Sequence, residues 1–232
     1  MAVPVPMKQR GWPMQFESVA TKRAKTHTRY YSRDGSLLPG VTTILGILNK
    51  PALLSWSNKL GLAGIEVGKY VDILALVGTT AHEMILAHLK NEKFDPDGLP
   101  ADIVDRAENA LLSYFEWEKN HKIKPIYCEK AFVSEQLGFG GTIDFYGEID
   151  GIVTLKDFKT SKAIYDEHLY QVAAYKILLV ENDCKVDAVG ILQIGRAENE
   201  GFSEKVITDC SKEFEIFRCC LEIYKLKKKH GR

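Results

Sequence analysis

The chain has few cysteines, and their spacing excludes several classes of protein. Five occur in 232 residues, and no two form a Cys-x-x-Cys pair: Cys128, Cys184, Cys210, Cys219 and Cys220. An odd number without that spacing argues against a disulfide framework, a zinc site and an iron–sulfur cluster. Reduced thiols in a cytoplasmic protein are therefore expected.

Long hydrophobic runs and a nucleotide-binding loop are also missing. The first ten residues lack the apolar core of a signal peptide, and no window approaches the length of a membrane span. No Gly-x-x-x-x-Gly-Lys-Ser/Thr pattern occurs, which excludes a P-loop motor. We expect a soluble cytoplasmic protein with no membrane partner, in the host cytoplasm if the chain is phage-encoded.

Net charge is zero, but the charges are unevenly distributed. Residues 1–35 carry seven Lys or Arg against two acids, a net of +5, and residues 221–232 carry five against one, a net of +4, so the middle is acidic. An acidic metal centre between basic ends suits an enzyme that handles phosphates. Solvated basic tails are the alternative, and for Lys227–Lys229 the simpler one.

The hydrophobic pattern predicts an α/β fold. A 45% hydrophobic content suits one core, so we divide the chain into a basic extension, residues 1–27, and a single domain, residues 28–232, with a basic C-terminal helix end. Helices are expected at 51–60, 65–89, 101–121, 169–180 and 212–229, strands at 126–134, 141–146, 152–158, 186–194 and 202–207, and a short hairpin at 30–39, with 42–48 unassigned. This order gives a helical N-terminal half on a central mixed sheet with a β-meander, a crossover helix and a return strand.

The most informative stretch is the hairpin around Asp150-Gly151, a dipeptide that favours a two-residue type I′ turn. If the turn is centred there, Asp144 lies opposite Asp157, and their Cβ atoms are roughly 5 Å apart on one face. Lys159 follows two residues later and joins that face. The sequence therefore predicts two carboxylates and an ammonium at one point.

Opposed carboxylates repel each other, so this arrangement needs a cation or a solvated position. Mg²⁺ typically takes one or two carboxylates and keeps several waters for substrate phosphates. A solvated salt-bridge cluster on a surface hairpin is the alternative, and the hairpin alone does not decide between the two.

Other polar residues are weaker candidates when taken singly. His82 falls in an apolar helical stripe and could point inward, although such a histidine is more often an ordinary core or surface residue. Glu129 lies on the strand before the hairpin, where an ordinary strand charge is the simpler interpretation. Gln171 and Tyr175 share one face of the following helix. Four aromatic residues could stack on unpaired bases, although core packing suits Trp56 better: Trp12, Tyr30, Tyr31 and Trp56.

Taken together, these motifs resemble the PD-(D/E)XK nuclease superfamily, in particular its RecB-like branch. They follow one another in the order of that family: Gly78-x-x-x-His82, Gly141-Thr-Ile-Asp144, Asp157-Phe-Lys159-Thr160-Ser161 and Gln171-Val-Ala-Ala-Tyr175. The stretch from Leu38 to Lys59 is similar to the leading part of phage-encoded members and of mitochondrial genome maintenance exonucleases. The resemblance covers about residues 28–195.

The resemblance implies a role for each position. Asp144 and Asp157 would bind Mg²⁺ or Mn²⁺ with the Phe158 carbonyl and His82, and Lys159 would position and help deprotonate the attacking water. Gln171, Tyr175, Thr160 and Ser161 would contact DNA or support the site, and Glu129 would give acidic support without being catalytic. Relatives with an iron–sulfur cluster carry four flanking cysteines, which this chain lacks, so no cluster is expected.

The implied activity is a metal-dependent DNA exonuclease that prefers single strands or free ends, used in phage recombination or genome processing. Two alternatives within the class are a duplex-resecting lambda-type exonuclease and a structure-specific endonuclease. A catalytically silent DNA-binding module is the alternative from another class. Any unwinding would come from a partner, so a helicase, recombinase or single-strand-binding protein is left open, as is an oligomer such as a toroidal trimer.

Overall fold

A five-stranded mixed sheet in the order β3-β4-β5-β6-β7 forms the centre of the fold. The computed structural model describes residues 28–231, so the extension at 1–27 lies outside the described range. β3 (Ile123–Ser134), β4 (Phe139–Ile149) and β5 (Ile152–Lys159) form an antiparallel meander, β6 (Ala188–Ile194) runs parallel to β5, and β7 (Phe202–Ile207) is antiparallel to β6. The predicted meander, crossover and return strand are confirmed.

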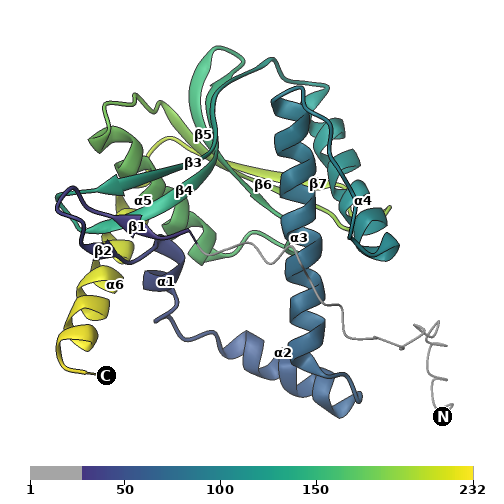
Figure 1. The fold of residues 1–232 in the computed structure, drawn as a ribbon, viewed down its shortest axis with the longest axis horizontal. Helices are drawn as coiled ribbons and strands as arrows, with labels where there is room; N and C mark the ends of the chain where they lie inside the picture. Colours follow the sequence, from purple (N-terminus) through teal and green to yellow (C-terminus); the bar gives the residue numbers. More distant parts are fainter. Residues whose placement is uncertain (1–27, 232) are drawn as a thin grey trace, which may run out of the picture.

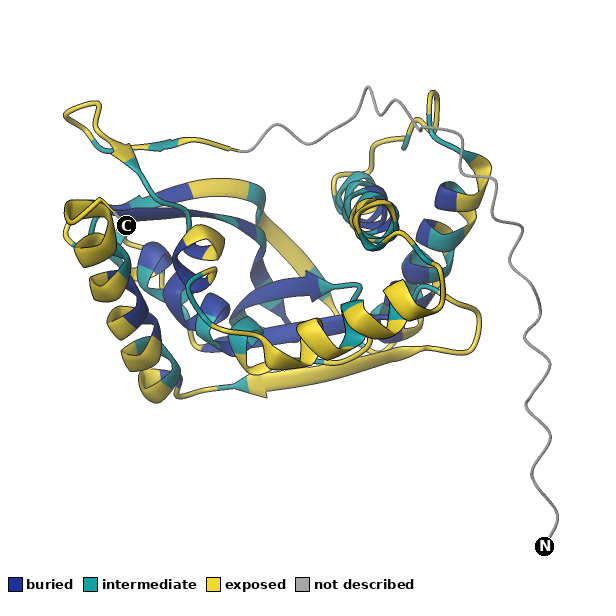
Figure 2. Cartoon of the chain, turned by 90° about the horizontal axis from the view of Figure 1, so that it is seen from below, coloured by how far each residue is buried: buried dark blue, intermediate teal, exposed yellow. Residues whose placement is uncertain are grey.

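Helices cover both faces of this sheet (Figure 1). α3 (Val67–Leu89) and α4 (Ala101–Glu118) pack on one face, and α1 (Val41–Leu45), α5 (Asp166–Glu181) and α6 (Ser211–Lys229) on the other. The segment left unassigned by the sequence pattern begins as α1. A small hairpin of β1 (Tyr30–Tyr31) and β2 (Leu37–Leu38) precedes it. α2 (Pro51–Leu62) has no buried residue and runs along the outside of the molecule (Figure 2).

The core consists of two apolar clusters separated by the sheet. On β6, Val189 and Ile191 face α5 and α6, whereas Leu192 and Ile194 face α3 and α4. A strand that is buried on both faces has a nearly continuous hydrophobic sequence, which explains the run Ala-Val-Gly-Ile-Leu-Gln-Ile. Each fully buried Leu or Ile contributes about 1.5–3 kcal/mol to the free energy of unfolding, so β6 anchors both layers.

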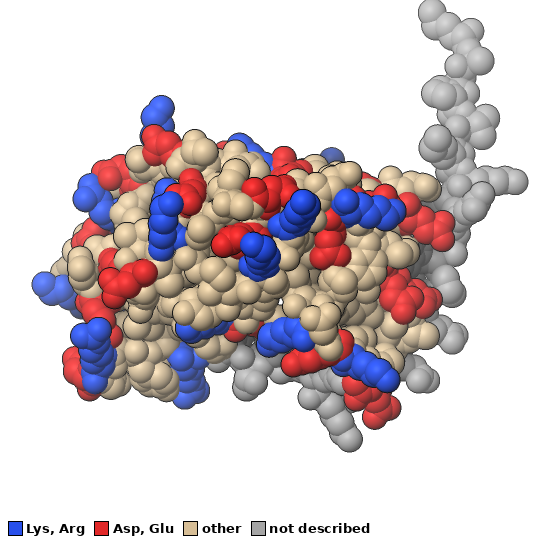
Figure 3. All heavy atoms as spheres, turned by 90° about the horizontal axis from the view of Figure 1, so that it is seen from above, with Lys and Arg blue, Asp and Glu red and all other residues tan. Residues whose placement is uncertain are grey.

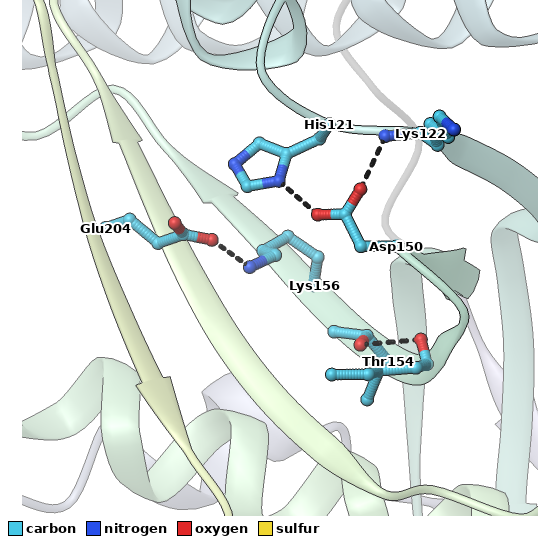
Figure 4. A network of polar contacts seen from close by, with 7 residues as sticks. His121, Lys122, Asp150, Thr154, Lys156 and Glu204 are labelled. Atoms are coloured by element: carbon cyan, nitrogen blue, oxygen red, sulfur yellow. Dashed lines mark hydrogen bonds and ion pairs between the residues drawn. The ribbon is translucent and has the colours of Figure 1, made fainter.

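The turn between β4 and β5 has the predicted type I′ geometry. Asp150 and Gly151 have φ of 53° and 82°, both left-handed, as that turn requires. The Asp150 carboxylate accepts the Lys122 backbone N–H at 2.8 Å and lies 2.7 Å from His121 Nδ1 (Figure 4), which ties the turn to the end of α4. The ladder then runs from Ile149↔Ile152 to Phe145↔Lys156, so the predicted register is confirmed over these pairs.

Alternation along β5 sends neighbouring charges to opposite faces. Lys156 is buried on the α4 side, where it pairs with Glu204 of β7 (Figure 4), and its Nζ lies 5.4 Å from the Trp117 ring centroid. A Cβ at Gly190 would lie 2.6 Å from Lys156 Nζ, so the glycine provides space for this lysine. Asp157 and Lys159 consequently point to the other face.

One expectation about the chain's hydrophobicity is wrong. By length and composition α3 is long and apolar enough to cross a membrane, whereas no window was expected to approach that length. Its C-terminal half supplies core residues, among them Val77, Ala81 and Ile85, which are fully buried. Core burial and membrane insertion select the same composition, so the apolar length of α3 alone does not distinguish them.

Positive and negative side chains are interspersed over the face of the molecule shown in Figure 3. Ion pairs at the surface of the molecule include Lys124–Glu148 at 3.0 Å and Lys185–Asp187 at 2.9 Å. Exposed pairs of this kind add little to stability. A binding site for a polyanion on this face would therefore depend on a few locally placed cations.

Candidate metal centre

Asp144 and Asp157 lie directly beyond the last ladder pair of β4 and β5, where the two strands separate. The Asp144 carboxylate bridges them, since its Oδ2 accepts the Phe158 backbone N–H at 3.0 Å. Asp157 is 1% exposed. Both acids thus sit at the same end of the hairpin, as the turn-centred register predicts.

Lys159 and Asp157 form a buried ion pair with 2.7 Å between Nζ and Oδ2, and the lysine side chain is 19% exposed. Within residues 28–231 the Lys159 ammonium is the partner of Asp157 Oδ2, and no other hydrogen bond reaches this buried oxygen. Burial excludes the alternative of a solvated salt-bridge cluster. A buried carboxylate needs a cation, and here Lys159 is the one that meets Asp157.

α3 brings His82 to the same point. Its Nδ1 lies 3.6 Å from Asp144 Oδ2, and its ring meets Phe158 edge-on at 6.1 Å between centroids. A pocket is lined here by His82, Asp144 and Glu129 together with three apolar side chains: Leu86, Leu89 and Phe158. His82 therefore points inward from the helix, toward the first carboxylate.

The two carboxylates have opposite pKa shifts. Burial, followed by the charge of Asp144, raises the pKa of Asp157 to about 6 against the attraction of Lys159. Burial also acts to raise the pKa of Asp144, but His82, Lys159 and the Phe158 N–H outweigh it and lower the value to about 2. The carboxyls hold the pKa of His82 and of Lys159 above their usual values despite the opposing effect of burial. The two carboxyls thus favour positive charge on His82 and Lys159, and a divalent cation would be favoured at the same place for the same reason.

The donors that surround this point suit a hard divalent ion. Within residues 28–231, no three His, Cys, Asp or Glu side chains are grouped closely enough to hold a metal ion by themselves. An ion between Asp144 and Asp157 would take its other ligands from a backbone carbonyl, such as that of Phe158, and from water. Two carboxylates plus water form the coordination that Mg²⁺ favours.

Gln171 and Tyr175 of α5 support the site from the face of the sheet that α5 covers. Both are buried, and the Gln171 amide donates a hydrogen bond to the Tyr175 hydroxyl at 2.8 Å. Burial and the charges of Asp157 and Asp144 hold the pKa of Tyr175 well above its usual value, so the hydroxyl stays protonated. The tyrosine ring packs against Gly141, because a Cβ there would lie 2.5 Å from Tyr175 Cε1. This burial suits a supporting role better than direct contact with DNA.

Thr160 and Ser161 follow β5 and have different surroundings. A Cβ at Gly78 would lie 2.9 Å from Thr160 Oγ1, so a glycine in the middle of α3 lets this helix approach the end of β5. The Ser161 hydroxyl donates to the Ala163 carbonyl at 2.7 Å within the loop that leads to α5. Both residues shape the rim of the site.

Glu129 adopts an unusual backbone conformation, with φ of 50°. The left-handed region costs a non-glycine residue roughly 1–2 kcal/mol. The strand is irregular here, since ladder pairs form on either side of Glu129 but not at it. Its side chain lines the same pocket as Asp144, and strain at a pocket residue often accompanies function.

Sequence reasoning missed His168 and misjudged Tyr30. His168 occupies the third position of α5, where burial and then the charge of Lys159 lower its pKa to about 4, so the ring is neutral at neutral pH. Tyr30 packs over Gly140, and its hydroxyl lies 3.0 Å from Thr142 Oγ1, so it serves the fold rather than base stacking. Trp56 lies 6.0 Å from Tyr70 between ring centroids, and Trp12 is outside the described residues. The hairpin expected at 30–39 places Tyr30 on a strand, but the sequence pattern does not predict that this strand packs on β4.

The contact between Gly78 and Thr160 yields a stability prediction. Gly78→Ala should gain about 1 kcal/mol from helix propensity, but crowding against Thr160 Oγ1 should offset that gain at a cost of roughly 1–3 kcal/mol. In a Thr160→Ala background the crowding disappears, and Gly78→Ala should then stabilise the protein. Urea unfolding of the four proteins of this cycle measures the coupling; equal effects of Gly78→Ala in both backgrounds would contradict the close approach.

Comparison with known proteins gives structural neighbours, of which the two described below are weak. No family model and no curated protein sequence matches the chain. Among solved structures, an alkaline exonuclease (LHK-Exo) from Laribacter hongkongensis is similar at 14% identity and a TM-score of 0.34, covering 65% of this chain and 83% of its own. The protein SSO0001 is similar at 15% identity and a TM-score of 0.33, covering 67% of this chain and 74% of its own. Likeness of this degree assigns no family, so the functional argument rests on the residues of the site.

Proposed function

We propose that this protein is a Mg²⁺- or Mn²⁺-dependent deoxyribonuclease of the PD-(D/E)XK type that acts as an exonuclease on single strands or free ends. One observation carries the proposal: Asp144, Asp157 and Lys159 meet at the point where β4 and β5 separate, and Asp157 is buried there in an ion pair with Lys159. The order of the four sequence motifs supports the same assignment.

In the reaction a water oxygen would bond to phosphorus as the bond from phosphorus to the bridging oxygen breaks. The proton of the attacking water would pass to solvent, and the departing oxygen would take a proton from solvent. A bound divalent ion would lower the pKa of the attacking water and offset charge on the phosphate. Asp144 and Asp157 would hold that ion. Because its pKa is raised, Lys159 stays an ammonium, which suits it to orient the water and stabilise developing negative charge rather than to accept a proton. Tyr175 and Gln171 would keep the strands in place from beneath.

The choice of DNA substrate follows from what the chain lacks. Without a P-loop motif, this chain would depend on a helicase or another partner to open a duplex, so single strands and ends are the simplest substrates for action in the cytoplasm. A lambda-type duplex exonuclease and a structure-specific endonuclease use the same metal chemistry and are separated by substrate rather than by site. A silent DNA-binding module is disfavoured because both acids and the lysine are retained.

The proposal is tested by digestion of 5′- and 3′-labelled DNA as single strands, blunt duplexes and flaps, with Mg²⁺ or Mn²⁺ and with an EDTA control. We expect metal-dependent release of nucleotides from single strands, and the labelled end identifies the polarity. Cleavage of duplex ends or flaps only would select one of the alternatives within the class. Binding without cleavage under both metals would overturn the enzymatic assignment.

A further inference from the structure

α6 carries a second apolar stripe in addition to the one that it buries. Its buried side packs toward α1 and α5. Four apolar residues recur on the outward side at intervals of three and four, and all of them are exposed: Ile216 (40%), Cys219, Ile223 (50%) and Leu226 (55%). At 3.6 residues per turn they form one narrow stripe, the outer seam, roughly opposite the buried side. α6 lies at the periphery of the molecule (Figure 1), which leaves the outer seam open.

The spacing of the outer seam is that of a coiled-coil helix. Ile216 and Ile223 are seven residues apart, and each is followed three residues later by another member of the seam, so the four residues alternate between the a and d positions of a heptad. A helix that packs on one core needs a single apolar stripe, and α6 has a stripe left over. A contiguous exposed apolar surface marks an interaction site, and this spacing favours a second helix as its occupant.

An identical helix fits the outer seam in the antiparallel orientation. In such a pair the a positions of one helix meet the d positions of the other, so Ile216 would lie against Leu226 of the second copy and Ile223 against Cys219. Both contacts belong to one register, because Ile223 follows Ile216 by seven residues and Cys219 precedes Leu226 by seven. Two-fold symmetry repeats each contact, so the whole outer seam is covered.

The same register brings opposite charges together on both sides of the outer seam. Glu215 would lie beside Lys229 of the second copy on one side, and Glu213 beside Lys227 on the other. Each contact occurs twice by symmetry. A parallel pair would instead place the lysines of the last turn of α6 against those of the second copy. Charges beside a seam set the partner and the orientation of paired helices, so they favour a second, antiparallel α6 here.

Ion pairs within one chain are compatible with these contacts. Glu215 uses one carboxylate oxygen for Arg218, at 2.6 Å, and a carboxylate can accept at both oxygens, so Lys229 of the second copy can also be bound. Glu222 would lie near its own counterpart at the centre of the pair. Lys225 lies 3.3 Å from Glu222 and offsets that repulsion.

We propose that two copies of this chain associate through the outer seam of α6 as an antiparallel, two-fold symmetric helix pair. A two-fold contact uses the same surface on both copies, so it closes as a dimer and does not propagate. This inference is independent of the nuclease function proposed above, because α6 holds none of the residues of the candidate metal centre.

Analytical ultracentrifugation of the full chain over a range of protein concentrations tests the dimer. The wild type should reach twice the mass of one chain, which is 26.1 kDa. Ile223→Asp should keep the mass of one chain at every concentration, because it would bury a charge in the apolar contact with Cys219. Ile223 is half exposed in a single chain, so the circular dichroism spectrum and the urea midpoint should stay close to those of the wild type.

Charge reversal tests the register. Glu213→Lys together with Glu215→Lys should raise the dissociation constant of the dimer about tenfold or more, because attractive pairs become repulsive. Lys227→Glu together with Lys229→Glu should have the same effect. The chain with all four substitutions should associate to within about threefold of the wild type, since every pair is restored with reversed sign. These four substitutions oppose the helix dipole, so recovered association could not come from a more stable α6.

Leu62→Asp is the matched control, because Leu62 of α2 is also an exposed apolar residue and lies outside the outer seam. Its dissociation constant should equal that of the wild type. A wild type that keeps the mass of one chain at every concentration would overturn the dimer, and a mass of three chains would overturn the two-fold contact. Dissociation by Leu62→Asp but not by Ile223→Asp would move the interface to α2. A monomeric wild type that binds phosphatidylserine vesicles, with binding lost in Ile223→Asp, would replace the second copy by a lipid surface.

Discussion

Asp157→Asn should abolish metal-dependent cleavage and yet stabilise the metal-free protein at pH 8. Cleavage should fall by about 10³-fold or more, because the carboxamide cannot replace the charge that holds a divalent ion against the phosphate. Stability should rise because Asp157 is buried, faces Asp144 and has a pKa raised to about 6, so its ionised form is disfavoured in the folded protein. A loss of cleavage by Asp157→Asn could then not be attributed to a less stable fold.

The sign of this stability effect depends on pH. In the folded protein Asp157 keeps its proton up to about pH 6, whereas the ordinary value is 3.8. The folded state therefore binds more protons between these values, and the wild-type free energy of unfolding falls as the pH rises through this window. The free energy of unfolding of Asp157→Asn should not fall in this way. The variant should therefore be as stable as the wild type below pH 4 and more stable by at most about 3 kcal/mol above pH 6, at 1.36 kcal/mol per pKa unit.

Thermal unfolding in EDTA and in Mg²⁺ at both ends of the window measures these effects. Mg²⁺ should stabilise the wild type at pH 8 and have little effect on Asp157→Asn. Asp187→Asn is the matched control, because Asp187 lies before the start of β6, at the opposite edge of the sheet, and pairs with the exposed Lys185 at 2.9 Å. Full cleavage by Asp157→Asn, or an Asp187→Asn protein that behaves in the same way, would reject the site assignment.

The sequence alone predicts that Asp144 and Asp157 lie at the same end of the hairpin, because the residues of the turn determine the pairing of the two strands. Asp150 and Gly151 both adopt left-handed φ, and this turn sets the register of every pair that follows, up to Phe145↔Lys156. The alternation that separates Lys156 from Asp157 is equally local. Layer order also follows from sequence, because a parallel pair such as β5 and β6 requires a crossover helix.

The remaining features depend on tertiary contacts that no local pattern encodes. Gly78 looks like a weak point of α3 until Thr160 is placed against it. The left-handed φ of Glu129 is imposed on a residue with no local preference for that conformation. Each of these features arises where distant segments of the chain meet.

Gly141→Ala should lower both stability and cleavage through Tyr175. The added Cβ would lie 2.5 Å from Tyr175 Cε1 and 3.0 Å from Leu178 Cδ1, and the tyrosine is 5% exposed, so its ring has little room to move. Overpacking of this kind costs roughly 1–3 kcal/mol. Asp144 follows three residues later on β4, and a displacement of about 1 Å at a catalytic group can lower the rate by about 10²-fold. Urea unfolding and initial cleavage rates measure the two effects.

A second substitution separates this mechanism from a general weakness of glycine replacement. Tyr175→Leu removes the ring atom that the new Cβ meets, so Gly141→Ala should cost much less in the Tyr175→Leu background than in the wild type. The two proteins that carry Tyr175→Leu both lack the hydrogen bond from Gln171, so its loss cancels in the comparison. Gly61→Ala on α2 is the matched control, because a Cβ there meets nothing within 4 Å and should add up to about 1 kcal/mol of helix stability. Gly141→Ala could instead lower the free energy of unfolding and the cleavage rate by the same amounts with and without the tyrosine ring. That result would show that the packing of Tyr175 on β4 is not what requires glycine at position 141, and that the two residues support the metal centre independently.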